Sequence, residues 1–204
     1  MLDINGRTIG GDNRPYIIAE AGTNFRGDVT LGKRFVEEAA NAGADAVKFQ
    51  THVRDAEMSE SGMRDLGFGD LYERLQEQEL STEQHRELQA HCADNDVDFI
   101  STPFSVEAVS RLAELDPPAI KIGSGELTNY HLLDAAAATG KPLLISTGMS
   151  DSAEVRDACS FVDDRTDQFA LFYCVSAYPT ATSDLNLDQI SEMQAEFDVA
   201  VGFS

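Results

Sequence analysis

The sequence lacks features that mark whole classes of protein. Its 204 residues include no tryptophan and only 15 lysine and arginine residues against 36 acidic ones, for a formal net charge of −21. Nucleic-acid binders need a basic face and anionic membranes attract basic segments, so we expect neither partner. Halophilic proteins use acidic surfaces, which makes a halophilic source a hypothesis. Unchanged unfolding stability between low and multimolar KCl would contradict it.

Cysteines and long apolar runs are also scarce. Cys92, Cys159 and Cys174 are odd in number and form no CxxC pair, so the sequence predicts neither a disulfide framework nor a thiolate metal site. This pattern fits a reducing compartment. No run of about 18 apolar residues is present, and the first residues lack the basic and apolar regions of a signal peptide. We therefore expect a cytoplasmic protein without a membrane span.

Short apolar runs recur along the chain at regular intervals. They are near-continuous in apolar character, which is typical of strands buried on both faces of a parallel sheet. They cover residues 16–22, 44–50, 97–102, 119–125, 142–148, 169–176 and 198–204. Amphipathic stretches lie between them, and two begin with capping-box spacing, Ser81 with Gln84 and Asp151 with Glu154. This alternation predicts serial βα units around a parallel sheet.

Such a sheet is either open and doubly wound or closed as a (β/α)₈ TIM barrel. No G-x-G-x-x-G follows the first strand, and the units are tight and regular, which favours the barrel. TIM barrels need about 250 residues. We therefore interpret residues 1–204 as a single barrel domain that is truncated after about the seventh strand and incomplete at its C-terminus. Residues 51–78 are weakly periodic and are expected to form an extended loop after the second strand.

Polar side chains close nearly every predicted strand. In a TIM barrel these carboxyl ends converge on the mouth that holds the active site. The residues concerned are Glu20, Lys48, Gln50, Ser101, Thr102, Lys121, Ser124, Glu126, Ser146, Thr147, Ser176, Tyr178 and Ser204. Glu20 and Glu126 are the candidate acid–base carboxylates among them.

Lysine is rare, with four in the chain, yet Lys48 and Lys121 lie inside apolar strands. A buried ammonium is costly unless it is paired. Three interpretations stay open. Each lysine forms an ion pair with a neighbouring carboxylate such as Glu20 or Glu126, or clamps a phosphate or carboxylate with help from nearby hydroxyls, or acts as a desolvated Schiff-base nucleophile.

Histidines give a weaker signal. His85 and His91 share one helical stretch and are expected at the surface, and His131 in the first turn of a helix is expected to be structural. His52 follows a strand end and could face the mouth. No HxxE pair or histidine cluster is present, so this chain alone provides no complete metal site.

The strand-end motifs, taken in order, resemble those of the sialic acid synthase family, which comprises N-acetylneuraminate synthases and their legionaminic and pseudaminic acid relatives. They read IIAEAGTNFRGD, AGADAVKFQT, FISTPFS, AIKIGSGELTN, KPLLISTGMS, CVSAYPT and VGFS, and together extend over nearly the whole chain. The KFQ, STPF, SGE-x-TN and STGM blocks are jointly specific. The resemblance implies a TIM barrel followed by a small antifreeze-like domain, which is absent here, and a full-length homodimer.

The resemblance also implies a reaction. Family members condense phosphoenolpyruvate with an open-chain N-acetylated amino sugar such as N-acetylmannosamine. Phosphate leaves with C–O cleavage, and the product is a nine-carbon 2-keto acid for surface polysaccharide or glycan biosynthesis. A divalent metal, typically manganese, polarises the sugar aldehyde. On this interpretation the protein is a phosphoenolpyruvate-dependent transferase whose partners are small-molecule substrates.

Matching motifs imply roles for individual residues. The implied phosphoenolpyruvate ligands are Lys48, Thr102, Lys121, Ser124, Ser146 and Ser204. Glu126 would lie near the reacting carbons, where it helps to position or activate water. Glu20, Gln50 and Tyr178 would surround the sugar or the metal-bound water, and Ser176, where the family often has Asn or Thr, is a further substrate-binding candidate. The lysines of this family act as cations, which disfavours the Schiff base.

The sequence departs from the family pattern at two places. The family's Asn-His-x-Gly after the first strand reads Asn24-Phe25-Arg26-Gly27, so we expect a polar ring to be lost at the mouth and leave the sugar open. The family's metal-binding histidines follow VGFS and end the eighth strand, beyond Ser204. We therefore expect this chain alone to be inactive. A Schiff-base lysine aldolase and a non-catalytic fragment are the alternatives.

Overall fold

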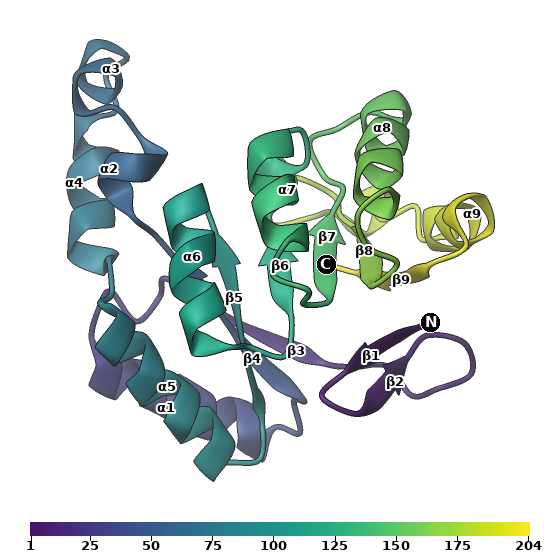
Figure 1. Ribbon diagram of the computed structural model, residues 1–204, viewed down its shortest axis with the longest axis horizontal. Helices are drawn as coiled ribbons and strands as arrows, with labels where there is room; N and C mark the ends of the chain where they lie inside the picture. Colours follow the sequence, from purple (N-terminus) through teal and green to yellow (C-terminus); the bar gives the residue numbers. More distant parts are fainter. The chain divides into compact units, whose positions relative to one another are not determined.

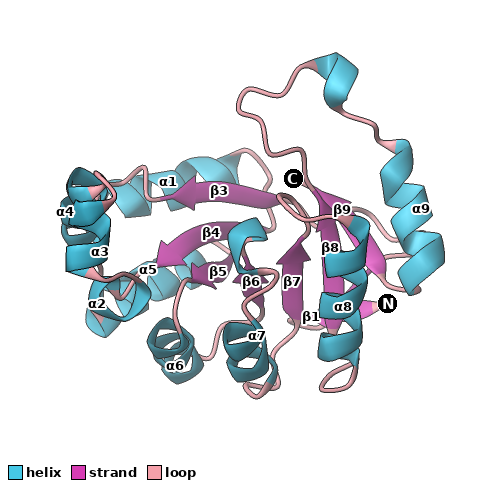
Figure 2. Cartoon of the chain, turned by 90° about the horizontal axis from the view of Figure 1, so that it is seen from above, coloured by secondary structure: helices cyan, strands magenta, loops and turns pink.

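The computed structural model describes residues 1–204, which form two compact units. One unit is Tyr16–Pro118, here the 16–118 unit. The other joins Met1–Pro15 to Ala119–Ser204 and is here the 119–204 unit. Parallel strands alternate with helices in each unit, as the apolar runs predict (Figures 1 and 2).

The 16–118 unit contains three parallel strands that pair in the order β3–β4–β5. The strands are β3 (Ile18–Gly22), β4 (Ala46–Thr51) and β5 (Asp98–Pro103), and the main helices are α1 (Val29–Asn41), α5 (Thr82–Asp94) and α6 (Val106–Leu115). Helices α1 and α5 pack side by side (Figure 1). The predicted capping box is present, because Ser81 Oγ accepts from Gln84 N and Gln84 Oε1 accepts from Ser81 N.

The expectation of an extended loop over residues 51–78 is wrong. This segment contains three helices, α2 (Arg54–Glu57), α3 (Glu60–Asp65) and α4 (Gly69–Gln78), here called the α2–α4 excursion. They follow β4 and stack together (Figure 1). Their apolar pattern is weak because α2 and α3 bury no residue and α4 buries only Tyr72 and Leu75.

The two faces of β4 have different chemistry. Side chains alternate along a strand, so Val47, Phe49 and Thr51 share one face while Lys48 and Gln50 share the other. Phe49 lies fully buried in an aromatic core between Phe25 and Phe99, with ring centroids 5.5 Å apart in both contacts. The apolar face anchors the strand, and the opposite face carries the polar residues.

The 119–204 unit contains four parallel strands in the order β6–β7–β8–β9. They are β6 (Ile120–Ile122), β7 (Leu143–Ser146), β8 (Phe169–Tyr173) and β9 (Ala200–Phe203), with helices α7 (Tyr130–Ala137), α8 (Ser152–Asp163) and α9 (Asp188–Phe197) and the short 3₁₀ turns η1 (Ser124–Glu126) and η2 (Thr182–Asp184). The capping box predicted for Asp151 and Glu154 begins α8. All residues of β6 and β7 are buried, as expected for strands covered on both faces.

An antiparallel hairpin precedes this parallel arrangement in the same unit. It joins β1 (Leu2–Ile4) to β2 (Arg7–Ile9) through Asn5 and Gly6, which both have positive φ, 52° and 77°. Asn-Gly between two strands is the strongest short hairpin signal, since both residues tolerate the left-handed region that a type I′ turn requires. No helix in either unit is long and apolar enough to cross a membrane.

Candidate active site

Lys48 lies in a polar cluster near the carboxyl ends of β3, β4 and β5. The parallel register places Glu20 beside Lys48 and Thr102 beside Gln50. Lys48 Nζ lies 2.5 Å from Glu20 Oε2 and 3.2 Å from Thr102 Oγ1. These four residues are here the Lys48 cluster, and they are the predicted site residues of this unit.

Lys48 forms an ion pair with Glu20, one of the three interpretations that the sequence left open. The two partners differ in exposure. The side chain of Lys48 is 12% exposed, whereas that of Glu20 is 52% exposed. A carboxylate that reaches solvent can give way to another anion at lower cost than a buried one, because water solvates it when it leaves. The ion pair therefore orients Lys48, and a bound anion can still replace Glu20 as the partner of its ammonium.

Gly22 lies close to the side-chain ends of Glu20 and Gln50. Its φ is +56°, and a Cβ there would lie 3.1 Å from Glu20 Oε1 and 4.0 Å from Gln50 Nε2. A larger residue would be strained by this backbone conformation and would push against the carboxylate. The polar ends of Glu20 and Gln50 thus both lie near Gly22.

His52 lies behind Gln50 and is 5% exposed, so it does not face an open mouth. Its Nδ1 lies 2.8 Å from Glu57 Oε2 and its Nε2 lies 3.1 Å from Gln50 Oε1. The ring stacks on Phe104, with centroids 4.6 Å apart and planes 7° from parallel. Both ring nitrogens and one ring face of His52 therefore have defined partners.

The sequence predicts that Phe25 replaces a polar ring at the mouth, but Phe25 lies in the core. Its side chain is 1% exposed and packs edge-on against Phe49, on the face of β4 opposite Lys48 and Gln50. The departure from the family's Asn-His-x-Gly pattern is therefore a core substitution in this unit.

In the 119–204 unit, Lys121 is the centre of a second cluster. Register places Lys121, Ser146 and Phe172 on one face of β6–β8. Lys121 is 6% exposed; its Nζ donates to Ser146 Oγ and to the Ile122 carbonyl, the latter at 2.9 Å, and lies 5.2 Å from the centroid of the Phe172 ring. Hydroxyl, carbonyl and aromatic face all stabilise a cation.

Two further predicted hydroxyls meet above Gly148. A Cβ on this glycine would lie 2.8 Å from Ser124 Oγ and 2.6 Å from Ser176 Oγ, so only glycine leaves room for both. Lys121 and Ser146 are here the Lys121 cluster. A cavity of about 510 Å³ is lined in part by Gly148, Ser176 and Arg156, and it has the size of a small-ligand pocket.

The other predicted residues of this unit are placed differently. Glu126 is half-buried in η1 and accepts a 2.7 Å hydrogen bond from Asn129 Nδ2, which fixes its carboxylate. Tyr178 is 86% exposed and precedes a cis peptide bond to Pro179. Ser204 is exposed, and its backbone N–H donates to the Tyr173 carbonyl at 3.0 Å. Tyr178 and Ser204 are therefore exposed, whereas Lys121 and Ser146 are buried.

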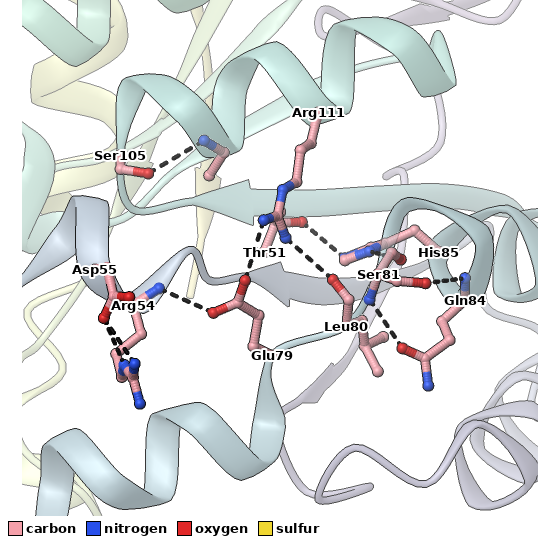
Figure 3. A network of polar contacts seen from close by, with 11 residues as sticks. Thr51, Arg54, Asp55, Glu79, Leu80, Ser81, Gln84, His85, Ser105 and Arg111 are labelled. Carbon is pink, nitrogen blue, oxygen red and sulfur yellow. Dashed lines mark hydrogen bonds and ion pairs between the residues drawn. The ribbon is translucent and has the colours of Figure 1, made fainter.

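The surface position expected for His85 is wrong, since its side chain is fully buried between α5 and the sheet of the 16–118 unit (Figure 3). Its Nδ1 lies 3.0 Å from the Ser81 carbonyl, which only accepts, so Nδ1 carries the proton. Thr51 Oγ1 then donates to Nε2 at 3.1 Å and accepts from Ser101 Oγ at 2.7 Å. Burial lowers the pKa of His85, which keeps the ring neutral.

The α2–α4 excursion is tied to the 16–118 unit at both ends (Figure 3). Arg111 of α6 donates to Glu79 Oε1 at 3.1 Å and to the Leu80 carbonyl at 3.2 Å. Glu79 Oε2 in turn accepts from the backbone N–H of Arg54 at 3.1 Å. One carboxylate therefore joins the start of α2 to the end of α4.

The metal implied by the family resemblance does not fit residues 1–204 taken alone. No group of three or more His, Cys, Asp or Glu side chains lies together in a way that could hold an ion. A catalytic zinc site is typically held by three protein ligands. We therefore assign no chemical step to a metal held by residues 1–204 alone.

Comparisons with known proteins agree with the strand-end motifs. The model of the NeuB family matches residues 35–204. The chain is 38% identical to N-acetylneuraminate-9-phosphate synthase of Drosophila melanogaster, over 93% of this chain and 53% of that protein, and 37% identical to N,N'-diacetyllegionaminic acid synthase of Legionella pneumophila, over 93% and 56%. It thus spans little more than half the length of these relatives.

A solved structure extends the likeness to the fold. The chain aligns with the crystal structure of N-acetylneuraminic acid synthetase from Leptospira borgpetersenii in complex with citrate, with a TM-score of 0.89 and 31% identity. The alignment covers 99% of this chain and 68% of that one. The predicted fold class, the alternating parallel strands and helices of a (β/α)₈ TIM barrel, is confirmed. The chain belongs to the NeuB family of sialic acid synthases.

Proposed function

We propose that the full-length protein is a sialic-acid-type synthase. It would condense phosphoenolpyruvate with an N-acetylated amino sugar to a nine-carbon 2-keto acid and release phosphate. Family membership supports this reaction class. The observation that carries the proposal is that each unit holds one lysine against a hydroxyl in apolar strands, Lys48 beside Thr102 and Lys121 beside Ser146.

The lysines fit a small, strongly anionic substrate. Phosphoenolpyruvate carries a phosphate and a carboxylate, and ammonium groups with adjacent hydroxyls bind such oxygens through charge-assisted hydrogen bonds. On a chain with a net charge of −21, local cations are needed to offset repulsion of that substrate. We assign its binding to Lys48, Thr102, Lys121, Ser124, Ser146 and Ser204.

The carboxylates have a different task in the proposed reaction. Carbon 3 of phosphoenolpyruvate attacks the sugar aldehyde, and water adds at the cationic carbon 2 before phosphate leaves with C–O cleavage. Glu126, fixed by Asn129, would position or activate this water. Glu20, Gln50, Ser176 and Tyr178 would contact the sugar.

The proposal includes a divalent metal, Mn²⁺, whose ligands would lie outside residues 1–204. When bound, such an ion supplies Lewis acidity toward the sugar aldehyde. A chelator should then abolish activity and Mn²⁺ should restore it, whereas full activity in chelator would contradict the metal role. We further propose one barrel domain over residues 1–204, a cytoplasmic location and a full-length homodimer.

The test uses the full-length protein with phosphoenolpyruvate, Mn²⁺ and a panel of sugars. The panel contains N-acetylmannosamine, its 6-phosphate and a diacetylated amino sugar, because the relatives differ in the product that they are named for. Phosphate release that matches formation of a nine-carbon keto acid, identified by mass, supports the proposal. A folded protein that releases no phosphate with any of these sugars contradicts it.

A further inference from the structure

A line of three side chains in the 16–118 unit connects the α2–α4 excursion to the Lys48 cluster. Glu57, His52 and Gln50 contact one another in that order. We propose that His52, held by Glu57, is a positioning residue that fixes the side-chain amide of Gln50 for recognition of the amino sugar. This inference rests on the proposed synthase function.

The His52 ring has little freedom to move. It is 5% exposed and stacked on Phe104, and its partner carboxylate on Glu57 has a side chain only 10% exposed. A carboxylate oxygen accepts, so the 2.8 Å contact places a proton on Nδ1. A carboxylate on one ring nitrogen of a histidine fixes both the orientation of the ring and the role of the other nitrogen.

That other nitrogen meets the amide of Gln50. With Gln50 Oε1 3.1 Å from His52 Nε2, the ring donates to the amide oxygen if both nitrogens carry a proton. If Nε2 is bare, the amide turns and its NH₂ donates to the ring. In either case His52 engages one end of the amide, and the other end lies near Gly22, where a Cβ would be 4.0 Å from Gln50 Nε2 and 3.1 Å from Glu20 Oε1.

This arrangement suits a neutral polar ligand. An amide end and the half-exposed carboxylate of Glu20 together recognise hydroxyl and amide groups, whereas the anionic substrate is assigned to the lysines. Glu57 is also the last residue of α2, and the backbone of Arg54 at the start of that helix is bound by Glu79. The docked excursion thereby sets the position of Glu57, and through His52 that of Gln50.

The first test measures steady-state kinetics of full-length His52→Asn and Glu57→Gln variants, with His131→Asn on the exposed start of α7 as the matched control. We expect the KM for the amino sugar to rise about ten- to hundredfold, as misplacement of a binding group does. The KM for phosphoenolpyruvate should stay unchanged. An equal rise in both constants, or none in either, overturns the positioning role.

The second test does not need activity. The side-chain NH₂ resonances of Gln50 are assigned by their loss in Gln50→Glu. Their shift is then compared between wild type and Glu57→Gln, a substitution that keeps the size of the Glu57 side chain and removes its charge. We expect these resonances to move toward those of exposed glutamines in the variant. Unmoved resonances overturn the inference. If wild type makes no product from any sugar, the proposed function fails while this readout still judges the positioning role.

Discussion

Lys121 on β6 donates a hydrogen bond to Ser146 on the neighbouring strand β7, and its ammonium faces the ring of Phe172 on β8. The hydroxyl and the aromatic face orient the ammonium of Lys121. The side chain is 6% exposed, and a cation is taken out of water at this cost only where something compensates for lost hydration. Under the proposed function, an anionic substrate joins these partners around the ammonium.

Replacing Lys121 by methionine should therefore weaken phosphoenolpyruvate binding. The variant keeps the length of the side chain but removes its charge and its hydrogen bond to Ser146. We expect a loss of about 2–5 kcal/mol, the range for truncating one partner of a buried charge-assisted contact. The KM for phosphoenolpyruvate, or its Kd by calorimetry, measures this loss.

Lys33→Met is the matched control for this substitution. Lys33 forms a 2.7 Å ion pair with Glu87, and the two side chains are 32% and 54% exposed. Surface pairs contribute about 0–1 kcal/mol to stability, and this one lies on α1, outside both clusters. An unchanged KM for phosphoenolpyruvate in Lys121→Met would refute the anion clamp.

Borohydride trapping should yield no covalent adduct on either lysine. An amine needs a free lone pair to attack a carbonyl, and the ammonium of Lys48 donates to Glu20 and Thr102 while that of Lys121 donates to Ser146. The measurement is the intact mass and peptide map after reduction in the presence of the amino sugar and pyruvate. A reduced adduct on Lys48 or Lys121 would establish the aldolase alternative instead.

The repeating order of strands and helices could be predicted because it depends on local sequence. Near-continuous apolar runs mark strands that are covered on both faces, and each predicted run overlaps one parallel strand. The clusters around Lys48 and Lys121 were also predictable, since strand ends collect at one edge of a parallel sheet. In both cases a short window of residues contains the information.

Other features depend on packing that no short window contains. His85 has the polar neighbours of a surface residue in sequence, yet its ring is buried edge-on against Phe99, and Thr51 supplies a hydrogen-bond partner from 34 positions away. The α2–α4 excursion carries few apolar residues, so no hydrophobic pattern predicts its helices. Hydrogen bonds and an ion pair hold its two ends instead. The hairpin over residues 2–9 is different, since its Asn5-Gly6 signal was present in the sequence and was missed.

The buried ring of His85 should make folding stability sensitive to acid. Its pKa is lowered from about 6.5 by burial, so below pH 6.5 the unfolded chain takes up a proton that the folded chain resists. Stability is therefore complete above pH 6.5 and declines as pH falls toward the folded-state pKa, by at most about 1.4 kcal/mol per pH unit. Urea unfolding between pH 8 and pH 5 measures this slope.

The comparison that isolates His85 is one of slopes, since replacing a buried ring also lowers stability at every pH. Between pH 6.5 and 5, the free energy of unfolding should fall less steeply in His85→Gln than in wild type, whereas His131→Gln, at an exposed position on α7, should retain the wild-type slope. Equal slopes in wild type and His85→Gln would show that the ring is not held neutral.

The three cysteines should differ in reactivity. Burial raises the pKa of both Cys92 and Cys159 to about 12, so almost no thiolate forms at pH 8, and the thiolate is the nucleophile. Cys174 is only half-buried. Iodoacetamide at pH 8, followed by peptide mass mapping, should label Cys174 first and the other two only after unfolding. Labelling of Cys92 as fast as that of Cys174 in the folded protein contradicts this burial.

The central claim is a condensation in which phosphoenolpyruvate loses phosphate by cleavage of its carbon–oxygen bond. It is tested most directly with phosphoenolpyruvate carrying ¹⁸O at the oxygen that bridges carbon 2 and phosphorus, supplied to the full-length protein with an N-acetylated amino sugar. The account predicts that the label appears in the released inorganic phosphate, together with a nine-carbon keto acid. Unlabelled phosphate, with the ¹⁸O retained on the organic product, would contradict it.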